Sequence, residues 1–206
     1  MIGIIDYGAG NLHSVLKAIA RLGYETKLIT KPTDHDERIT KLILPGVGNA
    51  KVAMTVLNQT GLSKYMREQV EKGMPLLGIC LGMQLLLEES AEGNVPCLGF
   101  LPGEVPLFDD RVEKVPHMGW NQVKDVQGHF LFKDIPDLTD FYFVHSYYAV
   151  PSKEEHILGT TSYGPDFACV IGNEQVIGVQ FHPEKSGQYG IQLLDNYCKQ
   201  GAKGNA

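Results

Sequence analysis

The chain has 206 residues, of which 43% are hydrophobic and 20% charged, and its formal net charge is -6. This length fits one domain with a sizeable core and leaves no room for two full catalytic domains. The ordinary composition excludes a disordered or fibrous chain, and the acidic balance without clustered Lys or Arg argues against nucleic acid as the main partner.

The first half of the sequence alternates short aliphatic runs with segments of helical period, a pattern typical of a parallel sheet covered by helices on both faces. A helix is predicted from Leu12 to Leu22, with Asn11 as its N-cap and Gly23 as its stop. The predicted strands of this half are residues 1–6, 24–30, 42–44 and 76–80, the last preceded by a helix-like segment that ends at Gly73.

The second half has a different hydrophobic pattern: helical periodicity fades after Ser90, and turn residues separate short β-rich runs. We expect antiparallel strands here, a hairpin loop at Asn173–Glu174 and a closing helix over 187–199. The β-rich runs are residues 141–150, 167–171 and 176–181. The whole pattern predicts a three-layer α/β fold: a mostly parallel central sheet flanked by helices, with an antiparallel β extension in the second half.

We predict a single domain over residues 1–200, followed by a polar tail at 201–206. The sequence has neither a basic leader nor a run of about 18 apolar residues, so a cytoplasmic protein that does not span a membrane is expected. Its cysteines are too widely spaced for C-x-x-C pairs, so we expect no metal site.

The strongest chemical signal is Gly78-Ile79-Cys80-Leu81-Gly82, which follows an apolar strand and precedes the helix-like segment 83–88. This arrangement indicates a nucleophile elbow, a strained turn whose nucleophile needs small neighbours two residues away on either side. A position at the start of a helix also favours the reactive thiolate. The alternative is that Cys80 is a buried core cysteine, a common fate of a cysteine in an apolar run.

A distant segment, Gln180-Phe181-His182-Pro183-Glu184, supplies an imidazole and a carboxylate at the end of the last predicted strand. His182 can take the thiol proton as a base, and Glu184 can hold the ring in the required tautomer. The alternative for His182 is a structural histidine with a satisfied hydrogen bond. His117 and His145 also lie beside aromatic residues, and the carboxylate neighbour favours His182 over them.

Acyl transfer from an amide also needs donors for the oxyanion of the tetrahedral intermediate. The backbone N–H of Leu81, directly after the nucleophile, is the natural first donor. A second donor is expected from the glycine-rich segment 45–48, where Val47 and Gly48 follow the third strand. The alternative for this segment is a plain turn at the end of a strand.

Together these residues resemble the class I, triad-type glutamine amidotransferases, whose pattern is P-G-x-G, then G-x-C-x-G-x-Q, then H-P-E. Within that superfamily, the segments 4–12, 116–121 and 143–147 are similar to the glutaminase subunits of imidazole glycerol phosphate synthases. The resemblance spans most of the chain. It implies a flavodoxin-like fold and hydrolysis of the glutamine side-chain amide by Cys80, His182 and Glu184, without a metal or organic cofactor.

The resemblance also implies the residues that hold L-glutamine. The backbone of the oxyanion segment and of the elbow would contact the substrate, and a carboxylate would select its α-ammonium group. That carboxylate is Glu92. Without the resemblance, the sequence around Glu92 predicts only a solvated charge in a loop. The implied substrate-binding residues are Gly46, Gly48, Leu81, Gln84, Glu92, Ser146 and Tyr147.

A further implication is a heterodimer with a (β/α)8-barrel cyclase subunit, HisF, which receives the ammonia through an internal channel. The cyclase would convert PRFAR into imidazole glycerol phosphate and AICAR in histidine biosynthesis. The sequence has no Walker P-loop and no complete G-x-G-x-x-G, which agrees with an acceptor site on another chain. The implied partner-facing residues are Met118, Trp120, Tyr142 and Lys185.

Three other functions are compatible with parts of this pattern. One is a glutaminase subunit of another ammonia-channelling synthase. Only two features argue against it, the opening segment and His117-Met118-Gly119-Trp120-Asn121. Another is a thiol peptidase or γ-glutamyl hydrolase that acts alone. The last is an inactive interaction subunit, which the filled triad positions disfavour.

Overall fold

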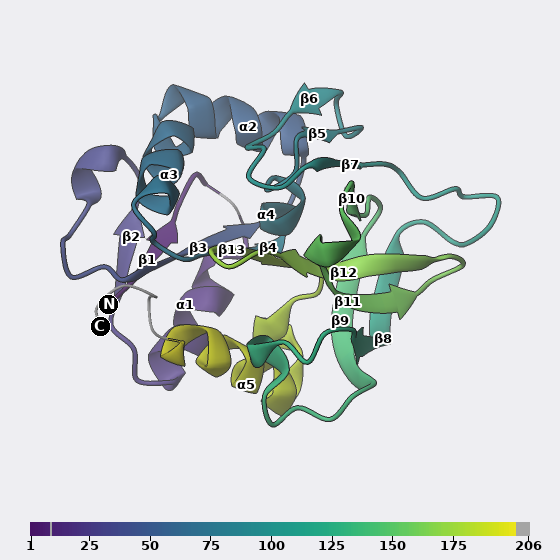
Figure 1. Ribbon diagram of the computed structural model, residues 1–206. Coiled ribbons are helices and arrows are strands. Elements are labelled where there is room, and N and C mark those ends of the chain that lie inside the picture. Colours follow the sequence, from purple (N-terminus) through teal and green to yellow (C-terminus); the bar gives the residue numbers. More distant parts are fainter. Residues whose placement is uncertain (9, 201–206) are drawn as a thin grey trace.

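The computed structural model describes residues 1–8 and 10–200 and is built around a nine-stranded sheet (Figure 1). Five neighbouring strands of this sheet are parallel and form its first half. In spatial order they are β2 (Thr26–Ile29), β1 (Ile2–Ile5), β3 (Lys41–Gly46), β4 (Leu76–Cys80) and β13 (Val176–Val179). All of them except the edge strand β2 are buried along their whole length, which is typical of strands that are covered on both faces.

The sheet continues beyond β13 with antiparallel pairings. The added strands are, in spatial order, β12 (Asp166–Gly172), β11 (Ile157–Ser162), β8 (His117–Asp125) and β9 (Thr139–His145). A smaller four-stranded sheet lies beside this part of the molecule. Its order is β10 (Val150–Pro151), β7 (Gly103–Val105), β5 (Glu89–Ser90) and β6 (Val95–Pro96).

Helices cover both faces of the parallel half, as Figure 1 shows. One face carries α1 (Leu12–Arg21) and α5 (Gly187–Lys199), and the other carries α2 (Ala50–Gln59), α3 (Leu62–Glu71) and the short α4 (Leu81–Gln84). The 3₁₀ turns are η1 (Pro32–Asp34), η2 (Phe130–Phe132), η3 (Glu154–His156) and η4 (Pro183–Lys185). Buried side chains form a separate apolar cluster under each helical layer. The predicted fold class is therefore confirmed.

Several predicted elements agree with the structure. The helix predicted to start at Leu12 is α1 and ends before Gly23, whose φ of 85° only glycine adopts readily. The closing helix has its predicted bounds, and residues 173–175 connect the antiparallel pair β12 and β13. The tail predicted at 201–206 lies outside the described residues, and the single domain over 1–200 stays a prediction.

Two predicted boundaries near the elbow are wrong. The helix after Cys80 ends at Gln84 instead of continuing to residue 88. The Leu87 N–H bonds to the Gln84 carbonyl three residues back, and the Glu88 N–H donates to the Gly103 carbonyl, so neither makes the i→i−4 bond that would extend the helix. Pro45 and Gly46 also belong to β3 itself, which shortens the loop behind that strand to Val47, Gly48 and Asn49.

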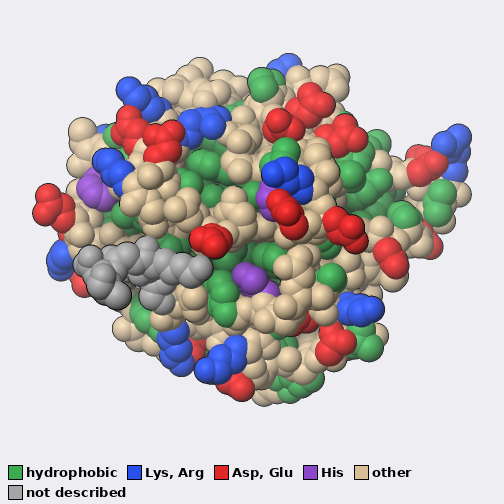
Figure 2. Space-filling model, viewed as in Figure 1, with side chains coloured by type: hydrophobic (Ala, Val, Ile, Leu, Met, Phe, Trp, Pro, Cys, Tyr) green, Lys and Arg blue, Asp and Glu red, His purple; other side chains and the backbone are tan. Residues whose placement is uncertain are grey.

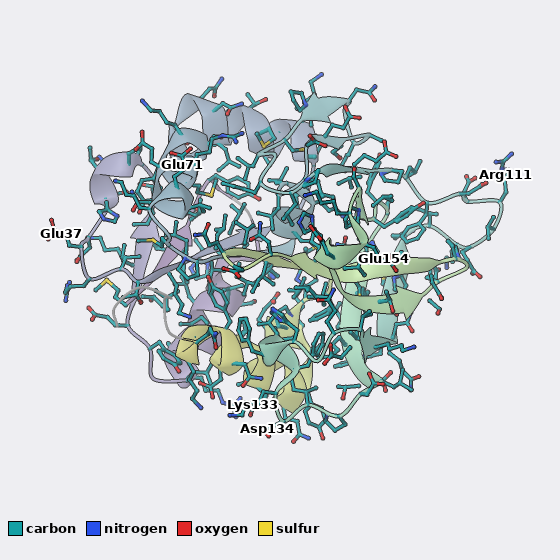
Figure 3. The ribbon with its side chains drawn as sticks, in the orientation of Figure 1. Glu37, Glu71, Arg111, Lys133, Asp134 and Glu154 are labelled. Atoms are coloured by element: carbon teal, nitrogen blue, oxygen red, sulfur yellow. The ribbon has the colours of Figure 1, made fainter. Side chains whose placement is uncertain are left out.

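The connection between β7 and β8 projects from the body of the molecule. Figure 3 labels Arg111 at its outer tip, and Figure 2 shows acidic and basic side chains together on this projection. Arg111 pairs with Asp109, 2.7 Å away, so the two charges largely neutralise each other. Across residues 1–8 and 10–200, no helix is long and apolar enough to cross a membrane.

Candidate active site

Cys80 occupies the sharp turn between β4 and α4. Its φ of 55° and ψ of -112° place a side chain in a backbone region that non-glycine residues rarely adopt. The turn is tight enough that a Cβ added at Gly82 would lie 1.9 Å from the Leu44 carbonyl oxygen. A Cβ at Gly78 would lie 2.5 Å from the Gly82 oxygen. These distances confirm the need for glycine on both sides of the elbow.

His182 reaches the elbow because β13 pairs with β4 in parallel, with Val179 opposite Ile79. The strand ends just before His182, and η4 turns Glu184 back towards the imidazole. His182 Nδ1 lies 2.8 Å from Glu184 Oε1, and both side chains are fully buried. Because Nδ1 faces the carboxylate, Nε2 is the nitrogen free for proton transfer, and it has no hydrogen-bond partner among the described residues.

The charge state of His182 follows from its surroundings. Burial lowers the pKa of the imidazole, but the interactions with Cys80 and Glu184 raise it more, to about 9. The ring therefore carries its proton at neutral pH. A protonated ring beside the nucleophile stands ready as the acid for a departing amine.

Asn11 is a member of this cluster that the sequence prediction missed. It is the N-cap residue of α1, as predicted, but its side chain makes no cap hydrogen bond to that helix. Instead its Nδ2 donates to Glu184 Oε1 and lies 3.2 Å from His182 Nδ1. No local pattern predicts this contact, because the two segments are 173 residues apart in the sequence.

A cavity of about 420 Å³ opens in front of Cys80, within the size range of small-molecule sites. Most of the predicted substrate-binding and oxyanion residues line it. The lining residues are Val47, Gly48, Cys80, Leu81, Gln84, Glu92, Pro116, Val144, His145, Ser146 and Tyr147. His182 and Glu184 lie behind Cys80 and do not line the cavity.

The predicted oxyanion segment lies directly against the elbow. Gly48 has a φ of 100°, a conformation that permits an N–H orientation unavailable to most residues. Gly46 is buried in β3 and does not line the cavity. A Cβ there would lie 2.5 Å from the Tyr7 hydroxyl and 2.9 Å from the Gly82 nitrogen, so Gly46 permits the close approach of strand and elbow.

Glu92 and Gln84 place polar groups at the cavity wall. Glu92 is half-buried and accepts a 2.7 Å hydrogen bond from the Ala50 N–H at the start of α2. Burial raises the pKa of its carboxyl group, and this hydrogen bond partly opposes the rise. The bare-sequence interpretation of a solvated loop charge is therefore wrong. Gln84 is buried, and its Nε2 donates to the Tyr147 carbonyl oxygen at 2.9 Å.

The four residues implied to face a partner lie close together, on β8, β9 and η4. Met118 and Trp120 are 62% and 58% exposed, unusual values for large apolar side chains on a sheet. Trp120 lies opposite Tyr142 in the β8–β9 pair, with the ring centroids 6.0 Å apart. Lys185 is exposed one residue after Glu184. Since His182 N–H donates to the Tyr142 carbonyl, this surface adjoins the candidate triad.

The solved structures that are similar to this chain share its fold. A structure of PurLQS from Thermotoga maritima matches with a TM-score of 0.76 and 16% identity, over 96% of this chain and 98% of that chain. A structure described as a glutamine amidotransferase matches with a TM-score of 0.73 and 22% identity, over 95% and 97%.

Sequence comparisons are more specific. The family model "Glutamine amidotransferase class-I" matches residues 3–200. The imidazole glycerol phosphate synthase subunit HisH of Moorella thermoacetica is 53% identical, covering 95% of this chain and 93% of that protein. The same subunit of Dehalococcoides mccartyi strain CBDB1 is 49% identical over 97% of both chains. The chain therefore belongs to the class I glutamine amidotransferases and, within them, to the HisH subunits of imidazole glycerol phosphate synthase.

Proposed function

We propose that the chain hydrolyses L-glutamine to glutamate and ammonia, with Cys80 as nucleophile, His182 as acid and base, and Glu184 as the group that orients His182. The observation that carries this proposal is the approach of two segments, about 100 residues apart in the sequence, beside one cavity. The strained Cys80 elbow opens into the cavity, and the buried His182–Glu184 pair, 2.8 Å apart, lies directly behind it.

In the first half-reaction, the Cys80 sulfur attacks the δ-carbonyl carbon of glutamine and forms a C–S bond. The carbonyl oxygen becomes an oxyanion, which the backbone N–H groups of Leu81 and of the Val47–Gly48 segment stabilise. The C–N bond then breaks, and the His182 imidazolium gives its proton to the departing nitrogen. Ammonia leaves, and a γ-glutamyl thioester remains on Cys80.

In the second half-reaction, water attacks the thioester carbonyl carbon while neutral His182 takes its proton. Collapse of the second tetrahedral intermediate breaks the C–S bond and releases glutamate. Cys80 and protonated His182 are thereby regenerated. Throughout both steps Glu184, with Asn11 beside it, keeps His182 Nδ1 engaged and Nε2 directed to the reacting groups.

Glutamine is held at both ends of the cavity in this proposal. The Glu92 carboxylate takes the α-ammonium group, which relieves the unfavourable burial of its own charge. Ser146, Tyr147 and Gln84 line the wall on which the rest of the substrate lies. Gly46 acts indirectly, by letting β3 approach the elbow.

The ammonia is proposed to pass to the HisF cyclase barrel, which makes imidazole glycerol phosphate and AICAR from PRFAR in the cytoplasm. Met118, Trp120, Tyr142 and Lys185 form the proposed contact surface. Two observations support this placement: the exposure of Met118 and Trp120, and the hydrogen bond that joins β9 to His182. Ammonia released at His182 would thus have only a short path to the interface.

The deciding experiment is glutamate release from glutamine by the purified chain, alone and with the HisF barrel and its ribulosyl ligand. We expect release that depends on the barrel and disappears in Cys80→Ala. The isolated chain is expected to be slow, since Gly48 lets the Val47–Gly48 segment rest with its N–H turned away. Release that depends on Cys80 but ignores the barrel would refute the pathway and retain the glutaminase.

The separate function of a stand-alone γ-glutamyl hydrolase is tested in the same assay with γ-glutamyl peptides in place of glutamine. Because γ-glutamyl peptides keep the free α-ammonium group, the assay also includes glutamine acylated at its α-amino group. We expect that substrate to react poorly, because the half-buried Glu92 carboxylate favours a free α-ammonium group at the cavity wall. Equal or faster hydrolysis of peptides extended at the α-amino group would contradict this assignment of Glu92.

A further inference from the structure

Gln180 lies directly behind the nucleophile. It follows β13 and is fully buried. Alternation along the strand puts its side chain on the same face as Gly178, against which Met83 packs. There its Nε2 lies 3.8 Å from Cys80 Sγ, and its Oε1 accepts a 3.0 Å hydrogen bond from Gln84 Nε2.

The orientation of these two amides is set by a backbone carbonyl. Tyr147 C=O accepts from Gln84 Nε2 at 2.9 Å, so the amide nitrogen of Gln84 must face that carbonyl. The second hydrogen on the same nitrogen then points to Gln180 Oε1. With its oxygen fixed as an acceptor, Gln180 has only its nitrogen left for the sulfur.

Two buried histidines extend the chain away from the sulfur. His145 Nδ1 lies 2.8 Å from the same Tyr147 carbonyl, and because a carbonyl only accepts, Nδ1 must carry the hydrogen. His145 Nε2 is then an acceptor, and it faces His117 Nδ1 at 3.0 Å. Burial lowers the pKa of His117 to about 4, which keeps the ring neutral as this pattern requires.

Asn121 fixes the far end of the chain. Its Oδ1 accepts from the Gln122 N–H at 2.9 Å, so its Nδ2 faces the Ser162 carbonyl at 2.8 Å and His117 Nε2 at 3.3 Å. Backbone groups therefore determine the donor and the acceptor at both ends. Each of these hydrogen bonds has a fixed donor, and those from Gln84 and from His145 converge on the Tyr147 carbonyl.

We propose that Gln180 is a further residue of this site: it donates an N–H to the Cys80 sulfur and is held in that orientation by Gln84 and the Tyr147 carbonyl, which His145, His117 and Asn121 support from the other side. The inference rests on the proposed function. An N–H donor favours the anionic sulfur, whereas the Val144 carbonyl, 3.9 Å from Sγ, can bond only the neutral thiol. The titratable groups that interact with the sulfur are His182 and Tyr7.

The test is the pH dependence of Cys80 alkylation by iodoacetamide, read on the Cys80 peptide by mass spectrometry. Gln180→Met keeps the side-chain volume and removes the donor. We expect its alkylation rate at pH 7 to fall roughly tenfold, with the pH midpoint moved upward, as for loss of a hydrogen bond to a charged group. The control is Gln69→Met, which removes a buried amide on α3 and should match the unmodified chain.

Gln180→Glu sharpens the comparison, since it keeps the acceptor for Gln84 but presents a carboxylate oxygen to the sulfur. Its rate should fall further than that of Gln180→Met. Superimposable pH profiles of alkylation for Gln180→Met and the unmodified chain, with circular dichroism showing both folded, would overturn the proposal.

If the Gln180 variants do not fold, the side-chain amide NMR resonances of Gln180 are compared between the unmodified chain and Cys80→Ala. An unchanged amide signal there would also overturn it.

His145→Phe tests the upstream part of the chain. The phenyl ring would keep the contacts of His145 with Phe108 and Phe143 but lacks both nitrogens. We expect a shift in the same direction as in Gln180→Met, and smaller, since the Gln84–Gln180 contact remains. No shift would refute the role of the histidines. Alkylation does not require glutamine turnover, so failure of the proposed function is detected separately, by glutamate release from the unmodified chain.

Discussion

Asn11 and Glu184 are joined by a hydrogen bond from the Asn11 side-chain amide to the same carboxylate oxygen that faces His182. This contact ties the start of α1 to η4 across 173 residues of sequence. It leaves Glu184 Oε2 without a hydrogen-bond partner among the described residues. The position of the orienting carboxylate therefore depends on Asn11 as well as on the turn at Pro183.

Substituting Asn11 separates its contact with the triad from a capping role. We expect Asn11→Ser to lower kcat roughly tenfold, because Ser is too short to hold Glu184, and to lower the free energy of unfolding by about 1–3 kcal/mol, because the buried carboxylate loses a donor. Asn11→Ala should lower kcat similarly. Steady-state glutaminase kinetics and urea unfolding check both variants. Full activity in Asn11→Ser would contradict the contact with Glu184 as a functional one.

The elbow predicts a large stability effect for one methyl group. Gly82→Ala would put a Cβ 1.9 Å from the Leu44 carbonyl oxygen, which forces backbone to move. We expect a loss of more than about 4 kcal/mol in the free energy of unfolding, or no folded protein. Gly10→Ala is the comparison, since its Cβ would meet only Val47 at 3.6 Å. Equal urea midpoints for the two variants would be inconsistent with the tight turn.

The raised pKa of His182 predicts both an NMR titration and a stability profile. The imidazole should titrate near pH 9, and in Cys80→Ala its pKa should fall, because one of the groups that raise it is gone. Between pH 6.5 and about 9 the folded chain binds this proton and the unfolded chain does not, so the unfolding free energy should fall with rising pH. The free energy of unfolding in urea is measured against pH for the unmodified chain and for His182→Gln, and the difference between the two isolates this effect. A difference that does not change with pH would refute it.

The assignment of Glu92 to the substrate ammonium predicts a selective effect on KM. Glu92→Gln keeps an acceptor oxygen for the Ala50 N–H but loses the charge, so KM for glutamine should rise roughly tenfold with a much smaller change in kcat. Glu89→Gln, at an exposed position on β5, is the matched control and should behave like the unmodified chain. An unchanged KM in Glu92→Gln would remove Glu92 from the binding site.

The exposed Trp120 predicts an anchor for the partner subunit. Trp120→Ala should weaken binding to the cyclase barrel roughly 30-fold or more, the usual effect of losing a central interface Trp. Val126→Ala, which removes another exposed apolar side chain just beyond β8, should leave the affinity unchanged. Isothermal titration calorimetry measures both. Equal affinities for the two variants would place the interface elsewhere.

The sequence predicts well those features that are coded locally. The strands of the parallel half and the helix α1 follow from hydrophobic period and from glycine stops, whereas β8 and β11 were not predicted. The elbow follows from Gly78 and Gly82 around Cys80. The shortened α4 could not be predicted, because the Glu88 N–H bonds to the Gly103 carbonyl, a contact that depends on the tertiary fold. The roles of Asn11 and Gln180 were hidden for the same reason. A fully buried Gln after an apolar strand is the one local signal that a polar partner must lie nearby.

The pairing of β4 with β13 has a consequence for the timing of biosynthesis. A ribosome makes the chain from its N-terminus, so Cys80 is translated long before the strand that carries His182 beside it. Until that late strand inserts between β4 and β12, the nascent polypeptide holds a cysteine without its imidazole. Under the proposed mechanism, glutamine consumption is thereby restricted to finished molecules, and incomplete chains released early neither drain the cellular glutamine pool nor liberate free ammonia.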